Sequence, residues 1–536
     1  MKQWWRSAAI YQIYPRSFLD TNQDGIGDLQ GIIARLDYVA QLGVDVVWIS
    51  PFYPSPMKDF GYDVVDYQNV DPRFGNLKDF SELVETANQL GLKVMIDLVL
   101  SHTSEQHPWF IESRRDRTGE KADWYVWADP KPDGTPPNNW LSIFGGSAWE
   151  WDTSRRQFYF HNFLTSQPDL NFHNPAVVEA VMNVAQFWLD LGVHGFRLDT
   201  VNWFFCDQRL RDNPVSNGEK LAYVPAASNY NMQAHIYNKS RPEVLPFLES
   251  FRTLIDRYDA ISLGELTAKN AIAMTQDYTE DSKRLHMVYT FSLLTKELSA
   301  AHIQQTIQDV EAHLSSGWVC WAFSNHDVER VVSRWRHPDF SVAHQAKFFL
   351  TLLMSLRGAV CLYQGEELGL TEAAIDFDDL QDPYGIRLWP KYKGRDGCRT
   401  PMPWQQNALN GGFSASKPWL PLPSEHLDKA VDTQEMQETS VLQFARSLIR
   451  WRKSQPALTD GSIHLLESSE HIVAFERRHP EQNILAVFNM HSKAATFECA
   501  KYERTLRPIE IGAGLNVTYE NGVLRLPGFS TFFAAI

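Results

Sequence analysis

The chain has 536 residues, more than one small domain needs, and 44% of them are hydrophobic and 21% charged, as in an ordinary globular protein. A formal net charge of −15 leaves no surplus of Lys and Arg for nucleic-acid phosphates or an anionic membrane surface, so both are unlikely partners. The five Cys residues form no CxxC pair, which argues against a disulfide framework and a zinc site and favours a reducing compartment.

The N-terminal segment MKQWWRSAAIYQIYPRSF has no uninterrupted apolar region followed by a cleavage site, so a signal peptide is not expected. No run reaches the length of about 18 apolar residues that spans a bilayer. We therefore expect a cytoplasmic protein, a monomer or a homodimer, with a small neutral molecule as its partner.

Short apolar runs rich in β-branched residues recur along the chain, each followed by a polar loop and a helical pattern. The runs are 9–14, 44–50, 93–99, 194–198, 260–263, 287–291, 318–323 and 359–363. Helix-length segments such as 79–90, 177–191 and 241–258 separate them. Near-continuous apolar strands alternating with helices indicate a parallel sheet, and eight of them predict a closed (β/α)8 TIM barrel, an α/β fold.

Two regions depart from this alternation. After the third run, the segment 104–167 is rich in Trp, Pro, Gly and Asn. This segment is too long for an ordinary loop, which predicts an inserted domain B. Beyond residue 456 the pattern changes to alternating strands at 464–466, 472–477, 484–488, 494–498 and 531–535. We therefore predict a barrel (domain A) over 1–103 and 168–456, and a C-terminal antiparallel, β-sandwich-like domain over 457–536.

Polar residues end four of the predicted barrel strands, where the active sites of such barrels lie. These residues are Asp97, His102, Arg197, Asp199, Glu265, Asn325, His326 and Asp327. Charged groups directly after apolar strands are costly unless they are paired or solvated in a cleft. Four strand ends that deliver carboxylates, His and Arg to one rim therefore predict an active site.

A pair of facing carboxylates is what glycoside hydrolysis requires, one ionised to attack the anomeric carbon and one protonated to serve the leaving oxygen. Arg197 shares a strand face with Asp199, so it is expected to lower the pKa of the Asp199 carboxyl and keep it charged. Glu265 follows the apolar run AISLG, which favours a raised pKa and an acid role.

Several motifs carry a resemblance that runs nearly end to end: YQIYPRSF, DTNQDGIGDLQGI, FGYDVVDY, QPDLNF, GFRLDT, SNHD, YQGEELG and GRDGCRTPMPW. On these motifs the chain resembles the α-amylase clan of glycoside hydrolases (family 13), and most closely its bacterial α-glucosidase and oligo-1,6-glucosidase branch. The resemblance implies a retaining, exo-acting enzyme with a covalent glucosyl intermediate, and with transfer to sugars alongside hydrolysis.

The same resemblance implies roles for single residues. Asp199 matches the nucleophile, Glu265 the acid/base and Asp327 a third carboxylate that holds sugar hydroxyls. The matching substrate-binding residues are Asp59, Tyr62, His102, Phe163, Arg197, Thr200, His326 and Arg395. Within this set Arg197 matches the residue that orients the nucleophile, Tyr62 the ring under the glucose, and Asp59 and Arg395 the pair that closes the pocket.

Two positions bear on specificity. Thr200 follows the nucleophile, where Thr is typical of α-1,4-preferring relatives and Val of α-1,6-preferring ones, so a short α-1,4 glucoside such as maltose is the expected substrate. Ser101 stands where many relatives have Asn. An oligo-1,6-glucosidase and a sucrose-acting glucosyltransferase or isomerase remain alternatives, although no clustered RLDR-type motif is present. A catalytically inactive transporter subunit would carry a membrane span and lack the carboxylates, the reverse of this chain.

The segment 20–28 resembles the start of a calcium loop, with oxygen donors at alternate positions. The resemblance implies one structural Ca²⁺ or Mg²⁺ ion, held by Asp20, Asn22, Asp24, the Ile26 carbonyl and Asp28. No organic cofactor is expected.

Some candidate residues have plainer interpretations. Asp97 is expected to support the nucleophile through hydrogen bonds rather than to react. Phe144, Phe163 and Phe291 fit an apolar wall around the sugar or core packing about equally. For most Trp residues of the inserted segment, the core of a small domain is favoured over platforms for sugar rings.

Overall fold

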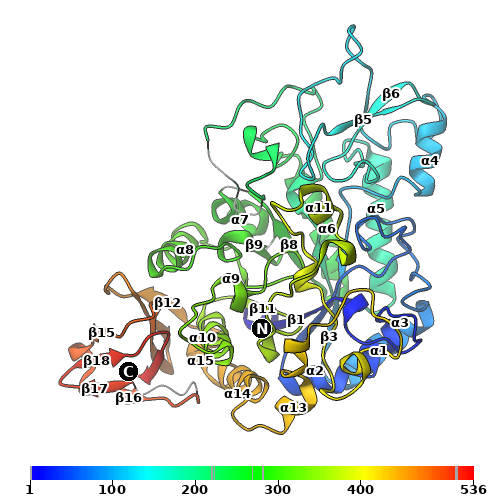
Figure 1. Cartoon of the computed structure of the whole chain (residues 1–536). Coiled ribbons are helices and arrows are strands. Elements are labelled where there is room, and N and C mark those ends of the chain that lie inside the picture. Colours follow the sequence, from blue (N-terminus) through cyan, green and yellow to red (C-terminus); the bar gives the residue numbers. More distant parts are fainter. Residues whose placement is uncertain (1–2, 219–220, 222–223, 269, 281–282, 513–516) are drawn as a thin grey trace.

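Eight parallel strands form the centre of the protein, as the sequence predicts (Figure 1). The computed structural model describes residues 3–218, 221, 224–268, 270–280, 283–512 and 517–536. The barrel strands are β1 (Ala9–Ile13), β2 (Val46–Ile49), β3 (Lys93–Leu98), β7 (Gly195–Leu198), β8 (Ile261–Leu266), β9 (Met287–Thr290), β10 (Cys320–Ala322) and β11 (Ala359–Tyr363). The sheet order is β10-β11-β1-β2-β3-β7-β8-β9, and a parallel bridge between Val288 and Val319 closes the ring.

Burial on both faces explains why these strands are apolar throughout. On β1, Ile10 faces the barrel interior with Trp48 and Met95, whereas Tyr11 and Ile13 pack outward against the helices. The same alternation of period two continues around the sheet. Side chains therefore fill the lower barrel, and only the carboxyl ends of the strands are left to form a site.

Helices surround the barrel, most of them on its outside and α11 (Pro383–Leu388) at the carboxyl ends of the strands. They are α1 (Leu29–Ile33), α2 (Leu36–Leu42), α3 (Leu77–Gln89), α5 (Pro175–Asp190), α6 (Val244–Ile255), α7 (Ala271–Thr279), α8 (Ala300–His313), α9 (Val331–Arg334), α10 (Val342–Ser355), α11 (Pro383–Leu388), α12 (Ser424–Leu427), α13 (Val431–Glu435), α14 (Val441–Ser454) and α15 (Pro456–Thr459). Helix α3 begins at a capping box formed by Asn76 and Asp79 and buries one face through Phe80 and Leu83. Within the described residues, no helix is long and apolar enough to cross a membrane.

A small antiparallel sheet interrupts the barrel between β3 and β7 and lies at the top of Figure 1. It contains β4 (Trp127–Ala128), β5 (Trp149–Asp152) and β6 (Gln157–Phe160), and α4 (Pro108–Arg115) precedes it. Trp124, Trp140 and Trp149 are buried there, so most of these Trp residues are core, as expected.

The chain ends in two antiparallel sheets at the lower left of Figure 1. Their strands are β12 (Ser462–Leu465), β13 (Ile472–His479), β14 (Gln482–Asn489), β15 (Ala495–Glu498), β16 (Arg507–Pro508), β17 (Thr518–Glu520), β18 (Val523–Leu526) and β19 (Thr531–Ala535). The five predicted strands are present, whereas β16, β17 and β18 are additional to the prediction.

Candidate active site

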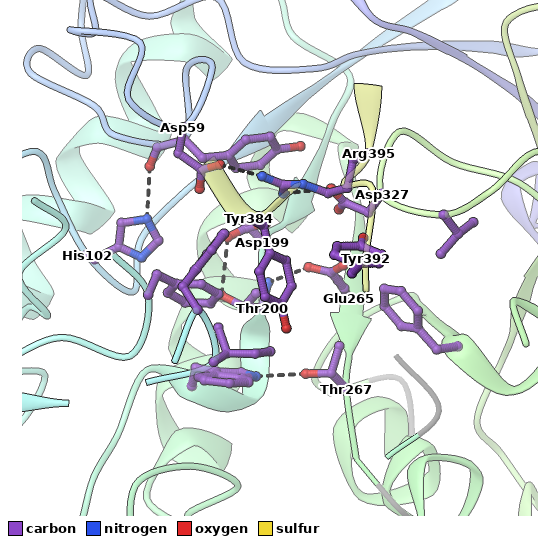
Figure 2. A pocket seen from close by; sticks show the side chains of 17 residues that line it. Asp59, His102, Asp199, Thr200, Glu265, Thr267, Asp327, Tyr384, Tyr392 and Arg395 are labelled. Carbon is purple, nitrogen blue, oxygen red and sulfur yellow. Dashed lines mark hydrogen bonds and ion pairs between the residues drawn. The ribbon is translucent and has the colours of Figure 1, made fainter. Parts of the chain in front are cut away.

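A pocket opens at the carboxyl ends of the barrel strands (Figure 2). The residues that line it are Asp59, Tyr62, His102, Ile143, Phe144, Phe163, Asp199, Thr200, Trp203, Glu265, Thr267, Phe291, Asp327, Val328, Tyr384, Tyr392 and Arg395. In Figure 2, Asp59, Arg395 and Asp327 lie together at the upper end of the pocket and Thr267 lies at the lower end. The structure thus brings together most of the residues that the sequence selects.

The barrel topology explains this convergence. Asp199 directly follows β7, Glu265 is the penultimate residue of β8, and Asp327 follows β10. Because all eight strands point the same way, their ends deliver these three carboxylates to one rim. His102 reaches the same rim from the loop after β3.

Arg197 joins the two carboxyls predicted to react. Its Nη1 lies 2.6 Å from Asp199 Oδ1 and its Nη2 lies 2.8 Å from Glu265 Oε2. Nη1 also lies 2.5 Å from Asp97 Oδ1, so the guanidinium contacts three carboxylates, and Asp97 supports the pair as expected. Arg197 and Asp97 are fully buried, which makes these charge-assisted contacts strong and fixes the geometry of the pair.

The pKa values of the two carboxyls separate in the direction that acid/base chemistry needs. Burial raises the pKa of Glu265 to about 8, although Arg197 acts to lower it. Burial also raises the pKa of Asp199, to about 6, against the opposing charge of Arg197. The predicted lowering of the Asp199 pKa is therefore wrong in sign, because desolvation outweighs the ion pair. Asp199 is still the more acidic carboxyl of the two.

The two oxygens of Glu265 have different surroundings. Oε2 accepts hydrogen bonds from Arg197 Nη2 and from the Thr200 backbone N–H, at 2.8 and 3.0 Å. Oε1 has a weaker contact with the Tyr289 hydroxyl at 3.3 Å. Since two N–H donors already point at Oε2, a proton on this carboxyl belongs on Oε1.

Thr200 has a strained backbone, with φ 41° and ψ 49°, the left-handed region that β-branched residues rarely adopt. This conformation directs its N–H to Glu265 while its hydroxyl donates to Asp199 Oδ2 at 3.2 Å. The Ser101 hydroxyl lies 3.3 Å from the Thr200 hydroxyl and 2.8 Å from His102 Nδ1. Strain of this kind persists where the surrounding structure enforces it, typically at functional sites.

Arg395 lies at one end of the pocket, among carboxylates (Figure 2). Its guanidinium lies 2.9 Å from Asp59, 3.1 Å from Asp327 and 2.7 Å from Asp382. Burial acts to raise the pKa of Asp327, but the neighbouring His326, Arg395 and Arg399 together hold that pKa well below its usual range. This end of the pocket therefore presents fixed charges to a polar ligand.

Aromatic rings form the rest of the pocket wall. Phe144, Phe163 and Phe291 all line it, and they also pack against the protein interior, so they take part in both the wall and the core. The Trp203 ring lies 5.0 Å from the Phe163 ring, tilted by 32°, and its indole N–H donates to the Thr267 hydroxyl. Such surfaces suit the apolar faces of a sugar ring.

Several lining residues have no role in the sequence prediction. Tyr384 and Tyr392 come from the segment around α11, and Asp382, behind them, holds Arg395. Their sequence surroundings carry no signal, because their position depends on how a long loop folds over the barrel. Trp203, four residues after Asp199, could have been found from its place in the loop that follows β7.

The structure places two of the predicted substrate-binding residues behind the pocket lining. The contact of Arg197 with Asp199 at 2.6 Å fits its predicted role of orienting the nucleophile. His326, predicted to donate to glucose hydroxyls, has no atom in the lining. Arg197 and His326 are fully buried and do not line the pocket. Each lies behind it and contacts residues that do, Arg197 through the reacting carboxyls and His326 through Tyr62 and Asp327. Their influence on a ligand is therefore indirect.

The loop predicted to bind a metal lies before α1, away from the pocket, and is held by its own hydrogen bonds. Asp20 Oδ2 accepts the Gly25 N–H at 2.8 Å, and Asp28 caps α1 by accepting the Gly31 N–H at 2.7 Å. Its side-chain donors, Asp20, Asn22, Asp24 and Asp28, and the Ile26 carbonyl are hard oxygens that suit Ca²⁺ or Mg²⁺. However, no group of three or more His, Cys, Asp or Glu side chains in the described part of the chain is arranged to hold a metal ion. The metal stays a prediction.

A (β/α)8 barrel with an insertion after the third strand, and with two bridged carboxyls and a third carboxylate at its rim, defines a class of glycoside hydrolase. Residues 12–461 match the model of the α-amylase catalytic domain. The chain belongs to the α-amylase family of glycoside hydrolases, in the branch of α-glucosidases and oligo-1,6-glucosidases.

Known relatives resemble the chain over its whole length. A probable alpha-glucosidase of Rhizobium meliloti (strain 1021) is 53% identical over 100% of this chain and 97% of its own. An oligo-1,6-glucosidase of Heyndrickxia coagulans is 35% identical over 93% of this chain and 94% of its own. The crystal structure of the alpha-glucosyl transfer enzyme XgtA is 52% identical, with a TM-score of 0.97 and 100% of both chains covered.

Proposed function

We propose that this enzyme is a retaining, exo-acting α-glucosidase that releases α-glucose from the non-reducing ends of short α-1,4-linked glucosides such as maltose. The observation that carries the proposal is the single Arg197 guanidinium, which contacts Asp199 and Glu265 at 2.6 and 2.8 Å. Retaining glycosidases hold their two carboxyls about 5–5.5 Å apart, and inverting ones about 6.5–9.5 Å apart. One guanidinium in contact with both groups favours the shorter separation.

In the first step, the ionised Asp199 carboxylate attacks C1 of the glucose ring. The C1–O bond to the leaving sugar breaks, and the proton on Glu265 Oε1 passes to the departing oxygen. In the second step, Glu265 takes a proton from water, the resulting hydroxide attacks C1, and the ester to Asp199 breaks. Two inversions at C1 release α-glucose and restore both carboxyls.

The closed end of the pocket supports exo-action. Asp59 and Arg395 block passage of a chain, so a glucoside enters only by its non-reducing end. Carboxylates and a guanidinium there match the hydroxyls of a terminal glucose, and Asp327, kept ionised by its arginine neighbours, favours a ring that gains positive charge.

The proposed α-1,4 preference rests on Thr200, whose hydroxyl contacts Asp199 Oδ2 at 3.2 Å. Preference for α-1,6 links, or sucrose as glucosyl donor, is the alternative within the same chemistry. Transfer of glucose to a sugar hydroxyl instead of water is also proposed. The likeness to an alpha-glucosyl transfer enzyme and the aromatic wall beside the carboxyls favour it.

We also propose that residues 20–28 bind one structural Ca²⁺ or Mg²⁺ ion, on the strength of their oxygen donors. The ion takes no part in the reaction, because the loop lies outside the pocket lining.

A substrate comparison tests the proposal. Initial rates of glucose release from maltose, isomaltose and sucrose at equal concentration are measured for the wild type and for Asp199→Asn. We expect the highest rate with maltose and loss of activity in the variant. A higher rate with isomaltose would reverse the linkage preference, and an active Asp199→Asn enzyme would remove Asp199 as the nucleophile.

A further inference from the structure

Gln12 is a buried polar residue that the reaction scheme leaves without a role. It lies on the inward face of β1 beside Ile10 and is fully buried. Its amide nitrogen lies 2.8 Å from His326 Nδ1 and 3.1 Å from the Ser50 hydroxyl oxygen, so each N–H has an acceptor. Among the described residues, no donor reaches Gln12 Oε1. A buried carbonyl oxygen without a partner costs stability, so this arrangement calls for a reason beyond packing.

The amide determines which nitrogen of His326 carries the proton. An NH₂ group can only donate, so His326 Nδ1 must accept and is unprotonated. Burial lowers the pKa of His326 to about 3, which keeps the ring neutral. A neutral imidazole with a bare Nδ1 carries its hydrogen on Nε2.

The hydrogen on Nε2 faces two residues of the pocket. His326 Nε2 lies 2.7 Å from the Tyr62 hydroxyl and 3.2 Å from Asp327 Oδ2. When Nε2 donates to the Tyr62 oxygen, the Tyr62 O–H is free to donate to Asp97 Oδ2 at 3.3 Å. Every donor in this series of hydrogen bonds then meets an acceptor, from the amide of Gln12 on β1 to the carboxylate of Asp97, which contacts Arg197.

The opposite tautomer of His326 would disturb the hydrogen bonds at both Asp327 and Asp97. With the hydrogen on Nδ1, the bare Nε2 would face the carboxylate of Asp327, two acceptors without a proton between them. The Tyr62 hydroxyl would then turn its hydrogen toward the ring, and Asp97 would lose a donor.

We propose that Gln12 is a positioning residue that fixes the Nε2–H tautomer of His326, and thereby the direction of the hydrogen bonds that hold Tyr62 and Asp327 at the pocket. The inference rests on the proposed function only where it assigns those two side chains to sugar binding.

Nitrogen NMR reads the tautomer directly. The enzyme is prepared with ¹⁵N-labelled histidine, and the His326 signals are assigned by their absence in His326→Asn. We expect the wild type to show an unprotonated Nδ1 and a protonated Nε2. A protonated Nδ1 in the wild type would overturn the proposal without any Gln12 variant.

Variants of Gln12 then test whether its amide sets the tautomer of His326. Gln12→Glu offers only acceptors once its carboxyl is ionised, so Nδ1 of His326 should become protonated as the pH is raised above the pKa of this buried carboxyl. Gln12→Met removes the donor, and we expect kcat/KM for maltose to fall about tenfold, the value of one buried hydrogen bond. The matched control is Gln345→Met, a buried Gln of α10 whose amide contacts only backbone groups. It should leave the His326 signals and kcat/KM unchanged.

His326 signals in Gln12→Glu that stay unchanged between about pH 6 and pH 10, or an equal loss of kcat/KM in the two Met variants, would overturn the proposal. The tautomer is measured without substrate, so this proposal can fail while the proposed function stands. The proposed function itself is contradicted only by an active Asp199→Asn enzyme or by a different order of substrate rates.

Discussion

Replacing Glu265 by Gln isolates the proposed acid/base group with little structural disturbance. The Gln carbonyl can occupy the place of Oε2 and accept from Arg197 and the Thr200 N–H, while the amide NH₂ faces the Tyr289 hydroxyl. The variant should therefore fold. It cannot deliver a proton, a function worth about 10²- to 10⁴-fold in rate, or about 3–5 kcal/mol of the activation barrier.

The pH profile gives this prediction its sharpest form. In the wild type, kcat/KM should rise through about pH 6 as Asp199 ionises and fall through about pH 8 as Glu265 loses its proton, with a maximum between them. In Glu265→Gln the basic limb should vanish, because the amide does not titrate. The acidic limb should remain near pH 6, since Glu265 is already uncharged there in the wild type.

The assay is kcat/KM for maltose and for 4-nitrophenyl α-glucoside between pH 5 and 9.5. The aryl leaving group needs less assistance from an acid. The loss of kcat/KM in Glu265→Gln should therefore be smaller with the aryl glucoside than with maltose. A suitable control is Glu372→Gln, because burial raises the pKa of Glu372 to about 8 as well, outside the pocket. A basic limb that persists near pH 8 in Glu265→Gln, or disappears in the control, would refute the reasoning.

Three further predictions concern specificity, stability and the metal. Thr200→Val keeps the branched shape but removes the hydroxyl that donates to Asp199, so the ratio of kcat/KM for maltose over isomaltose should fall about tenfold. An unchanged ratio would contradict the role of Thr200 in linkage preference. Arg395→Ala leaves Asp59 and Asp382 without their cation, whereas Asp327 keeps Arg399 at 2.9 Å, and denaturant unfolding should show a loss of about 3–5 kcal/mol together with weak activity. Wild-type stability in that variant would contradict the ion-pair argument. Removal of divalent ions by a chelator should lower the Tm, and Ca²⁺ or Mg²⁺ at about 100 times its Kd should restore about 2.7 kcal/mol; a Tm that neither chelator nor ion changes would argue against the metal.

The barrel could be predicted because its signal is local and repeated. Each strand is buried on both faces, so each appears in the sequence as an apolar run between helical segments. The rim residues follow from the same pattern, since Asp199, Glu265 and Asp327 come at strand ends. Parallel topology then leaves little freedom in where they meet.

One hairpin of the C-terminal domain has a local sequence signal that the predicted strands do not include. Strands β17 and β18 flank Asn521 and Gly522, both with positive φ, a pair typical of tight hairpin turns. The missed hairpin therefore had a sequence signal. Strand β16 had none, because it is two residues long and contains Pro508.

Other features of the site depend on three-dimensional packing. Asp382 and Tyr384 reach the pocket region through the fold of a long loop, which no local pattern encodes. The sign of the Asp199 pKa shift depends on a balance between burial and the charge of Arg197, and burial is known only once the neighbouring elements are placed. The burial of His326 depends on residues far from it in the sequence, among them Tyr14 and Tyr62, which contact its ring.

The central claim is retention through Asp199 and Glu265, and the anomer of the first product tests it most directly. With 4-nitrophenyl α-glucoside all released glucose comes from the glycosyl side, so proton NMR in the first minutes reports the stereochemistry before mutarotation. The account predicts that α-glucose appears first and then equilibrates. Initial β-glucose would show a single displacement by water and would contradict the assignment of Asp199 as a nucleophile.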